Sequence, residues 1–244
     1  YNKAARFQVP TNSISNVCRK QISDRGQRIK TLPYPLTWKP SSQIDFNQKK
    51  KIILYAGRIH PEKGIKELID AWINISEKNI NGWKLRLIGP WSEEQGGGGK
   101  KFLDELKNLA KKSKNPVEFK NPIFQRELLK SEMENAKFFI YPSQAAYGET
   151  FGLAVLEAMS CGCIPIVSEL PCFKDFITFG RDGFCVGKKR NITNSIQKKL
   201  CEVLILSESN LNKIALSAWN RSKEYELEKV AKMYLDDFFL LLQK

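Results

Sequence analysis

Two short apolar runs, each followed by a loop and then by helical spacing, constrain the fold of this chain most strongly. Residues 51–57 read Lys-Ile-Ile-Leu-Tyr-Ala-Gly, and residues 137–141 read Lys-Phe-Phe-Ile-Tyr. A near-continuous apolar run is typical of a parallel strand that is covered on both faces. We therefore expect an α/β fold, in which a parallel sheet is flanked by helices.

The segment 147–158 follows the second run and reads Tyr-Gly-Glu-Thr-Phe-Gly-Leu-Ala-Val-Leu-Glu-Ala. Its two glycines let backbone approach a ligand, and a helix from about Phe151 would aim free N–H groups at the loop, which suits an anion. Glu149 lies in the loop, and Glu157 lies down the helix, where the helical part of their separation is roughly 9 Å. This layout suits a ligand with hydroxyls at both ends and phosphate between them, such as a nucleotide-sugar.

The segment 57–64 follows the first run and reads Gly-Arg-Ile-His-Pro-Glu-Lys-Gly. It lies at the carboxyl end of a strand, where open α/β sheets bind ligands. The guanidinium of Arg58 and the ammonium of Lys63 would complement phosphate oxygens. His60 is the only histidine, so this chain holds no multi-histidine metal site; contact with a ligand and a plain loop role both stay open for it.

These motifs resemble the retaining glycosyltransferases of family GT4, which have the GT-B fold. Glu149 and Glu157 match the Glu-x7-Glu signature, and the resemblance extends over residues 141–143, over 157–167 and to the Gly-Arg-x4-Lys-Gly spacing. The alternative is that the two glutamates lie on a solvated loop and helix. The resemblance implies a Rossmann-like, donor-binding, C-terminal half of a GT-B enzyme.

The resemblance also implies an activity: transfer of a sugar from a nucleotide-sugar, such as a UDP- or GDP-sugar, to a glycan or glycolipid acceptor with retention of configuration. No cofactor and no metal are expected, and the chain contains no Asp-x-Asp. Glu149 is the expected catalytic residue and orients the sugar hydroxyls, Arg58 and Lys63 bind the diphosphate, and Glu157 accepts from the ribose. The other expected donor contacts are Gly57, Gly89, Asn121, Ile123, Phe151, Gly152 and Leu153.

The segment after the third expected strand departs from the family pattern Phe-x-Gly-x-Val. It reads Phe119-Lys120-Asn121-Pro122-Ile123, so the identity of the base stays open. Two other functions compete with glycosyl transfer: another nucleotide-sugar enzyme with a GT-B-like fold, such as a non-hydrolysing epimerase, and a non-catalytic nucleotide-sugar-binding module.

Three parts follow from the resemblance. Residues 1–50 resemble the end of an N-terminal acceptor domain and the interdomain linker, although a self-contained β-α-β cap is the alternative. Residues 51–223 form the donor-binding domain, and residues 224–244 form a helix that crosses back. On this interpretation the chain is a fragment. Within it we expect Ser13 or Ser15 to cap a helix, and we expect Gly96 to Gly99 to form a mobile loop.

Charge and cysteine content narrow the partners. The net charge is +14, from 40 basic and 26 acidic residues, which favours anionic partners. The chain has no aromatic-basic strand motif, so we expect no nucleic-acid partner.

The six cysteines contain no Cys-x2-Cys pair, and Cys161 and Cys163 are expected to pack against the sheet. We expect a cytoplasmic protein, and the apolar residues 238–242 either pack on the acceptor domain or dock on a membrane surface.

Overall fold

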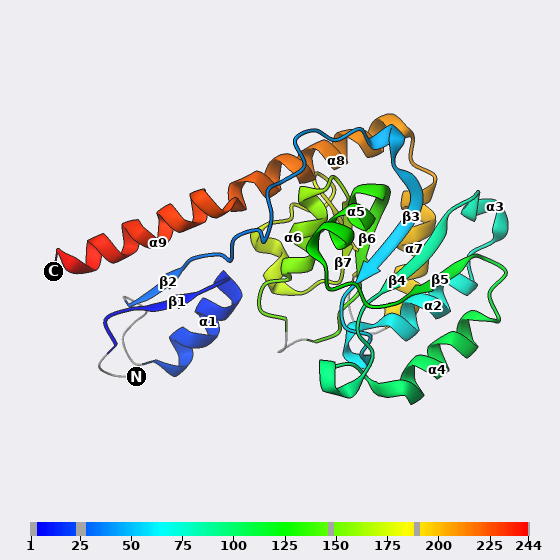
Figure 1. Cartoon of the computed structure of the whole chain (residues 1–244), viewed down its shortest axis with the longest axis horizontal. Helices are drawn as coiled ribbons and strands as arrows, with labels where there is room; N and C mark the ends of the chain where they lie inside the picture. The colour runs from blue at the N-terminus through cyan, green and yellow to red at the C-terminus, as the bar shows by residue number, and fades with distance from the viewer. Residues whose placement is uncertain (1–3, 23–27, 146–148, 188–190, 244) are drawn as a thin grey trace.

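The computed structural model describes residues 4–22, 28–145, 149–187 and 191–243. Figure 1 shows a sheet-and-helix body and, to one side of it, an arm formed by the two ends of the chain. Among the described residues, no helix is long and apolar enough to cross a bilayer.

The body is built on a six-stranded sheet in which every neighbouring pair is parallel, in the order β5-β4-β3-β6-β7-β8. The chain adds β4 and β5 on one side of β3, then returns to the other side for β6, β7 and β8, so the direction reverses between β3 and β6. The predicted fold class is confirmed. The strands are β3 Lys50–Ala56, β4 Lys84–Ile88, β5 Val117–Lys120, β6 Ala136–Tyr141, β7 Ile164–Val167 and β8 Phe184–Cys185.

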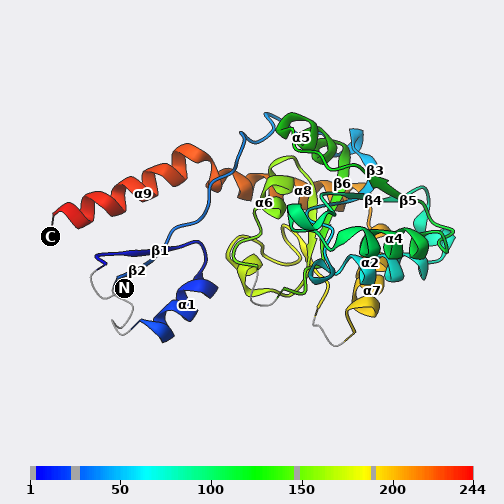
Figure 2. The ribbon, with the colours of Figure 1, turned by 60° about the horizontal axis from the view of Figure 1, so that its bottom comes forward.

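Helices cover both faces of this sheet (Figure 2). On one face α2 contacts α4 and α7, and on the other α6 contacts α5 and α8. The α-helices of the body are α2 Ile65–Ile73, α3 Glu77–Ile80, α4 Gly99–Ala110, α5 Arg126–Asn135, α6 Leu153–Ser160, α7 Ile192–Leu204 and α8 Glu208–Ser222. The short 3-10 helices are η1 Phe46–Gln48, η2 Pro61–Lys63, η3 Glu93–Gln95, η4 Pro171–Asp175 and η6 Lys223–Tyr225.

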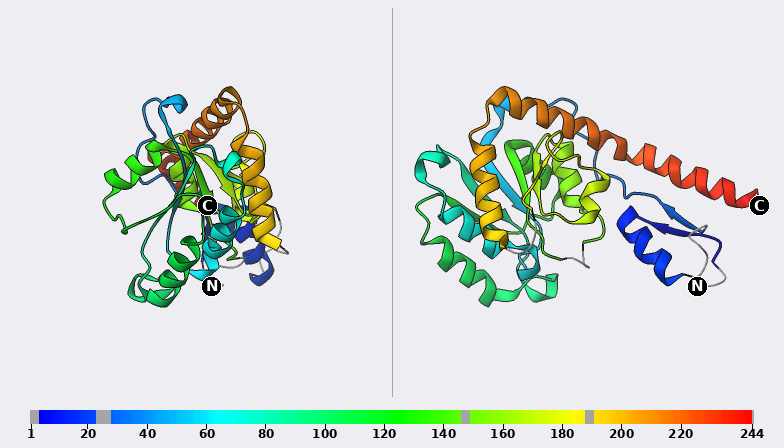
Figure 3. Two further views of the ribbon diagram at one scale, coloured as in Figure 1. Left: turned by 90° about the vertical axis from the view of Figure 1, so that its right-hand side faces the viewer. Right: turned by 180° about the vertical axis from the view of Figure 1, so that it is seen from behind.

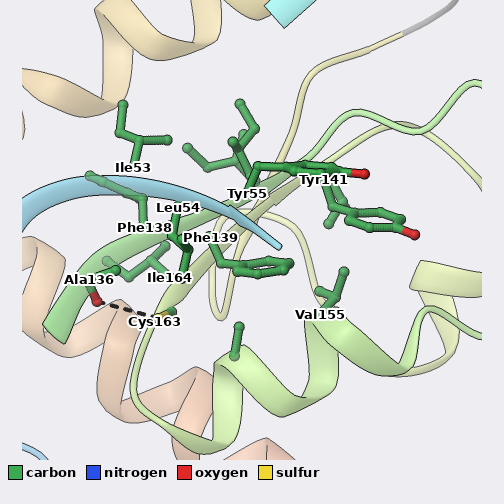
Figure 4. Close-up of a cluster of buried hydrophobic side chains, with 14 of the residues drawn as sticks. Ile53, Leu54, Tyr55, Ala136, Phe138, Phe139, Tyr141, Val155, Cys163 and Ile164 are labelled. Atoms are coloured by element: carbon green, nitrogen blue, oxygen red, sulfur yellow. Dashed lines mark hydrogen bonds between the residues drawn. The ribbon is translucent and has the colours of Figure 1, made fainter. Parts of the chain in front are cut away.

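The core lies where β3, β6 and β7 pack on α6 (Figure 4). Ile53 and Phe138 are fully buried there. The Cys163 thiol donates to the carbonyl of Ala136, at 3.3 Å (dashed in Figure 4), and burial raises its pKa to about 11. Cys161 is buried as well. The prediction that these two cysteines are packing residues is confirmed, and a thiol with a raised pKa is a poor nucleophile.

The arm joins the two ends of the chain. It contains β1 Phe7–Val9, α1 Asn12–Gln21, β2 Ile29–Thr31 and α9 Leu227–Leu242. The strands β1 and β2 are parallel, and α9 runs over them (Figure 3, right). The buried carboxylate of Asp237 lies 3.0 Å from the Arg6 guanidinium and accepts from Gln8 at 3.2 Å. The final helix therefore crosses back to the first residues of the chain.

Beyond these contacts, the last turns of α9 expose apolar side chains. Phe239 is 59% exposed and Leu242 is 81% exposed. Both predicted partners of this end, an acceptor domain and a membrane, stay predictions.

One local prediction about the arm is wrong, and one helix of the body was not predicted. Neither Ser13 nor Ser15 caps α1, because the cap is Thr11, whose side chain accepts from the Ile14 amide at 3.4 Å. The helix α8 was not predicted at all. Its buried face consists mainly of small residues, including Ala215 and Ala218, which give a weak hydrophobic pattern but let α8 lie close to α6.

The predicted mobile loop of Gly96 to Gly99 is also wrong. The amides of Gly97, Gly98 and Gly99 donate to the carbonyls of Ser92, Ile59 and Trp91, each at 2.8 Å. A Cβ on Gly97 would lie 2.2 Å from the carbonyl carbon of Trp91. Here the glycines are needed so that two stretches of backbone can touch.

This close approach can be tested with Gly97→Ala. The added methyl group must displace backbone, so we expect a loss of about 1–3 kcal/mol of unfolding free energy and a fall in Tm of several degrees. Thermal melts should show little change for Gln95→Ala, which removes an exposed side chain from the same segment. If Gly97→Ala had the same Tm as the parent, the prediction of a mobile loop would be supported after all.

Candidate active site

The loops that follow β3 and β6 meet at the point where the strand order reverses. The Gln144 amide donates to the Glu62 carbonyl at 2.7 Å. Gly64 has φ +69°, and a Cβ there would lie 2.3 Å from the Pro142 carbonyl oxygen. Loops at the carboxyl ends of parallel strands, at such a reversal, form the ligand crevice of open α/β sheets. This crevice is the candidate active site.

A buried ion pair joins the two loops. Lys63 is only 5% exposed, and its Nζ lies 3.0 Å from Glu149 Oε2. The same Nζ lies 5.4 Å from the centre of the Tyr141 ring, within range of a cation–π contact. The sequence assigned Lys63 to phosphate and Glu149 to sugar, and the structure brings the two side chains into direct contact.

Two tyrosines support this pair, and the sequence analysis missed both. Their rings stack at 5.8 Å at the carboxyl end of the strands (Figure 4). Burial together with the charge of Glu149 raises the pKa of the Tyr141 hydroxyl. The Tyr55 hydroxyl donates to the Arg58 carbonyl at 2.7 Å, and burial raises its pKa as well. Both phenols therefore stay protonated; the one available signal was a hydroxyl at the end of an apolar run.

Arg58 lies on the loop after β3 and is tied to two other segments. Its guanidinium donates to Glu62 at 2.8 Å and to the Gly96 carbonyl at 2.7 Å, and its side chain is 43% exposed. The ordered glycine segment therefore fixes Arg58. The Nδ1 of His60 accepts from the Glu62 amide at 3.3 Å and caps η2, which gives this residue a structural role in the loop.

Two of the glycines expected to contact the donor, Gly89 and Gly152, lie close to other parts of the protein. A Cβ on Gly89 would lie 1.8 Å from the Gly57 carbonyl oxygen, so the backbone of one loop fills the space beside the other. Gly152 has φ +88°, and a Cβ there would lie 2.4 Å from the Phe173 ring. It is the N-cap of α6 and offers no side chain, so the first amides of this helix, beginning at Leu153, have no side-chain cap.

Phe151 and the base-side residues are further expected donor contacts. The Phe151 ring is 2% exposed and packs on Tyr34 at 5.5 Å, so only its backbone could face a ligand. Asn121 is exposed and Ile123 is half-buried; both follow β5, two strands away from β3. Residues 146–148, which begin the central motif, lie outside the described residues.

Glu157 lies on α6 and contacts the segment that links the arm to the body. The Thr37 hydroxyl donates to its Oε1 at 2.5 Å. The residue is 9% exposed, and burial raises its pKa, while the hydrogen bond from Thr37 and the charge of Arg126 oppose the rise. The sequence singled out Glu157 but gave no sign of Thr37.

The sequence profile of the family described as "Glycosyl transferases group 1" matches residues 37–213, more than half of the chain. The chain belongs to this family. The match covers both loops of the crevice, α6 and Thr37. The GT-B resemblance inferred from the motifs is therefore confirmed.

Several proteins are similar to this group 1 chain. A GDP-mannose:cellobiosyl-diphosphopolyprenol alpha-mannosyltransferase of Xanthomonas oryzae pv. oryzae is 25% identical over 77% of this chain and 46% of its own length. A lipopolysaccharide 1,2-N-acetylglucosaminetransferase of Salmonella typhimurium is 27% identical over 66% of this chain and 42% of its own. The chain therefore spans less than half of the length of these relatives.

Solved structures share the fold. The pneumococcal O-GlcNAc transferase GtfA, solved with UDP and GlcNAc, has a TM-score of 0.78 at 19% identity and covers 100% of this chain and 46% of its own. HepE of Anabaena, solved with UDP and glucose, has a TM-score of 0.74 at 16% identity and covers 96% and 63%. Among the described residues of this group 1 chain, no three His, Cys, Asp or Glu side chains cluster as metal ligands.

The raised pKa of Glu157 predicts a stability effect. In the folded protein this pKa lies above the ordinary value of 4.5, so ionisation of the carboxyl group destabilises the fold once the pH exceeds 4.5. Glu157→Gln keeps an acceptor for Thr37 but never ionises. We expect it to raise the unfolding free energy at pH 7, and we expect this gain to disappear as the pH falls to 4.5. Urea titrations at several pH values measure it.

The matched control is Glu127→Gln, which removes an exposed carboxylate from the neighbouring helix α5. It should change stability little at any pH. A Glu157→Gln variant that is less stable than the parent at pH 7 would contradict the cost of this buried charge.

Proposed function

We propose that this chain is the donor-binding part of a retaining, metal-independent GT4-type glycosyltransferase that uses a nucleotide-sugar. The observation that carries the proposal is the buried Lys63–Glu149 pair at the reversal of the strand order, in a group 1 chain. A buried cation and carboxylate in a ligand crevice offer separate sites for phosphate and for sugar hydroxyls.

The diphosphate would exchange partners with this pair. Its oxygens would bind Lys63 and Arg58, which contact Glu149 and Glu62 in the free protein. The uncapped amides at the start of α6 would complete the anion site. These fixed donors would stabilise the charge that develops on the leaving phosphate, a role that other enzymes give to a magnesium ion.

The carboxylates would then hold the two ends of the donor. Glu149, released from Lys63 and still beside Tyr141, would accept from the sugar hydroxyls. Glu157 would accept from the ribose. Front-face attack, assisted by the departing phosphate, would retain the configuration of the sugar.

The acceptor belongs to the remainder of the protein. The names of the two curated relatives point to lipid-linked and lipopolysaccharide glycans, so we propose a glycan or glycolipid acceptor and a cytoplasmic enzyme. We also propose that the exposed apolar end of α9 packs on the rest of the acceptor domain, since Asp237 of this helix already contacts Gln8 of β1 and the preceding Arg6. Membrane docking is the competing outcome.

Phosphate binding is tested first. Arg58→Ala and Lys63→Ala should each weaken the binding of UDP or GDP, because each removes a contact worth about 1.5–3 kcal/mol. The affinity for uridine or guanosine should change little. Lys66→Ala is the matched control, because Lys66 is an exposed lysine of the same segment that pairs with Glu105. Equal losses for the diphosphate and the nucleoside in calorimetry would show that Arg58 and Lys63 only shape the loop.

The two glutamates should separate binding from transfer. Glu149→Gln should spare UDP or GDP affinity and slow sugar transfer in the whole protein, because its contact strengthens in the transition state. Glu157→Gln should weaken the diphosphate itself, since donor and product share the ribose. Titrations and a radiolabelled-sugar assay measure both.

If Glu149→Gln lost diphosphate affinity while Glu157→Gln kept it, the proposed direction of the ligand along α6 would be wrong. Diphosphate binding by the whole protein without transfer to any acceptor would favour a non-catalytic binding module. Interconversion of the free nucleotide-sugar would favour an epimerase.

A further inference from the structure

The segment that links the arm to the body is seated on helices α5 and α6. The Trp38 indole donates to Ser160 Oγ at 3.0 Å, and the Ser41 amide donates to the Ser160 carbonyl at 3.1 Å. On α5, Arg126 donates to the Thr37 carbonyl at 3.4 Å. Each end of this linker segment, residues 36–41, therefore has a fixed position against the body.

Within this seat, Thr37 makes the one contact that reaches a proposed ligand-binding side chain. Its hydroxyl donates to Oε1 of Glu157, and among the described residues no other hydrogen bond reaches this carboxylate. Oε2 remains available to a ligand. A glutamate side chain has several rotatable bonds, so one hydrogen bond from a fixed backbone decides where its second oxygen points.

The burial of Glu157 makes this contact important. A carboxylate that is 9% exposed has lost most of its water and needs donors to stay charged. The charge of Arg126 lowers the pKa of Glu157, against the effect of burial, and the Arg126 guanidinium donates to the backbone carbonyl of Thr37. Thr37 therefore supplies a hydrogen bond in place of water at Glu157 and also binds a cation that favours its charge.

We propose that Thr37 is a positioning residue for nucleotide binding: its hydroxyl holds the Glu157 carboxylate so that Oε2 meets the ribose. This inference rests on the proposed function, in which Glu157 binds the ribose.

The test compares two substitutions of Thr37 by calorimetry with UDP and with GDP. Thr37→Val keeps the shape and removes the hydroxyl, and it should weaken the diphosphate by about tenfold, the order expected for one hydrogen bond to a charged group. Thr37→Ser keeps the hydroxyl and should stay within about twofold of the parent. The control Trp38→Phe removes the neighbouring bond to Ser160 and should leave the diphosphate affinity unchanged.

A double substitution shows whether Thr37 acts through Glu157. In a Glu157→Ala background, where Thr37 has no side-chain acceptor left at position 157 and binding is already weakened, Thr37→Val should add less than about a twofold loss, because contacts that act as a unit are not additive. A full tenfold loss in that background would mean that Thr37 acts by seating the linker alone, and would overturn the proposal. So would parent-like affinity of Thr37→Val in the parent background.

Failure of the proposed function would look different. A parent protein that binds neither UDP nor GDP would remove the donor site itself, and the positioning role with it. A parent that binds one of them, with Thr37→Val equal to it, would leave the donor site intact and reject only the role of Thr37.

Discussion

The ion pair between Lys63 and Glu149 is the interaction on which the architecture of the site depends. Lys63 ends η2 after β3, and Glu149 follows β6, so the pair closes the gap between the two strands at which the sheet reverses direction. A cation that is almost fully buried is costly unless it is paired. The pair therefore forces the two loops together in the free protein, and any ligand that takes over Lys63 must supply negative charge of its own.

Around this pair, several of the predicted ligand-binding residues are held in place by contacts within the protein itself. The carbonyl of Gly96 and the carboxylate of Glu62 fix Arg58, and Phe151 is part of an aromatic cluster with Tyr34 and Phe176. Such support reduces the freedom that a binding site must lose when its ligand arrives. Glu157 differs from these side chains, because its buried charge destabilises the folded protein. Such a cost is typical of residues that serve a ligand rather than the fold.

The sequence predicted the strands and the loops that follow them, because apolar runs and glycine spacing depend on local chemistry. It also placed Glu149 before the helix α6 and Glu157 within it, while their roles stay predictions. It did not predict what depends on distant packing. The hydrogen bond from Thr37 to Glu157 joins residues separated by 120 positions, and no local pattern reveals it. From composition alone, the glycines at 96–99 were expected to form a flexible backbone. Contact with Trp91 instead makes them a tightly packed segment. The helix α8 was missed because alanines on its buried face look neither polar nor strongly apolar.

The arm has a consequence for how the protein assembles. Every strand of the central sheet comes from residues 50–185, so a growing chain can complete that sheet while synthesis continues. Asp237 is different, because its partners Arg6 and Gln8 leave the ribosome earlier and must wait for more than two hundred further residues. The chain therefore completes its body early and closes its arm late, and during that interval the parallel strands β1 and β2 lack the helix that covers them.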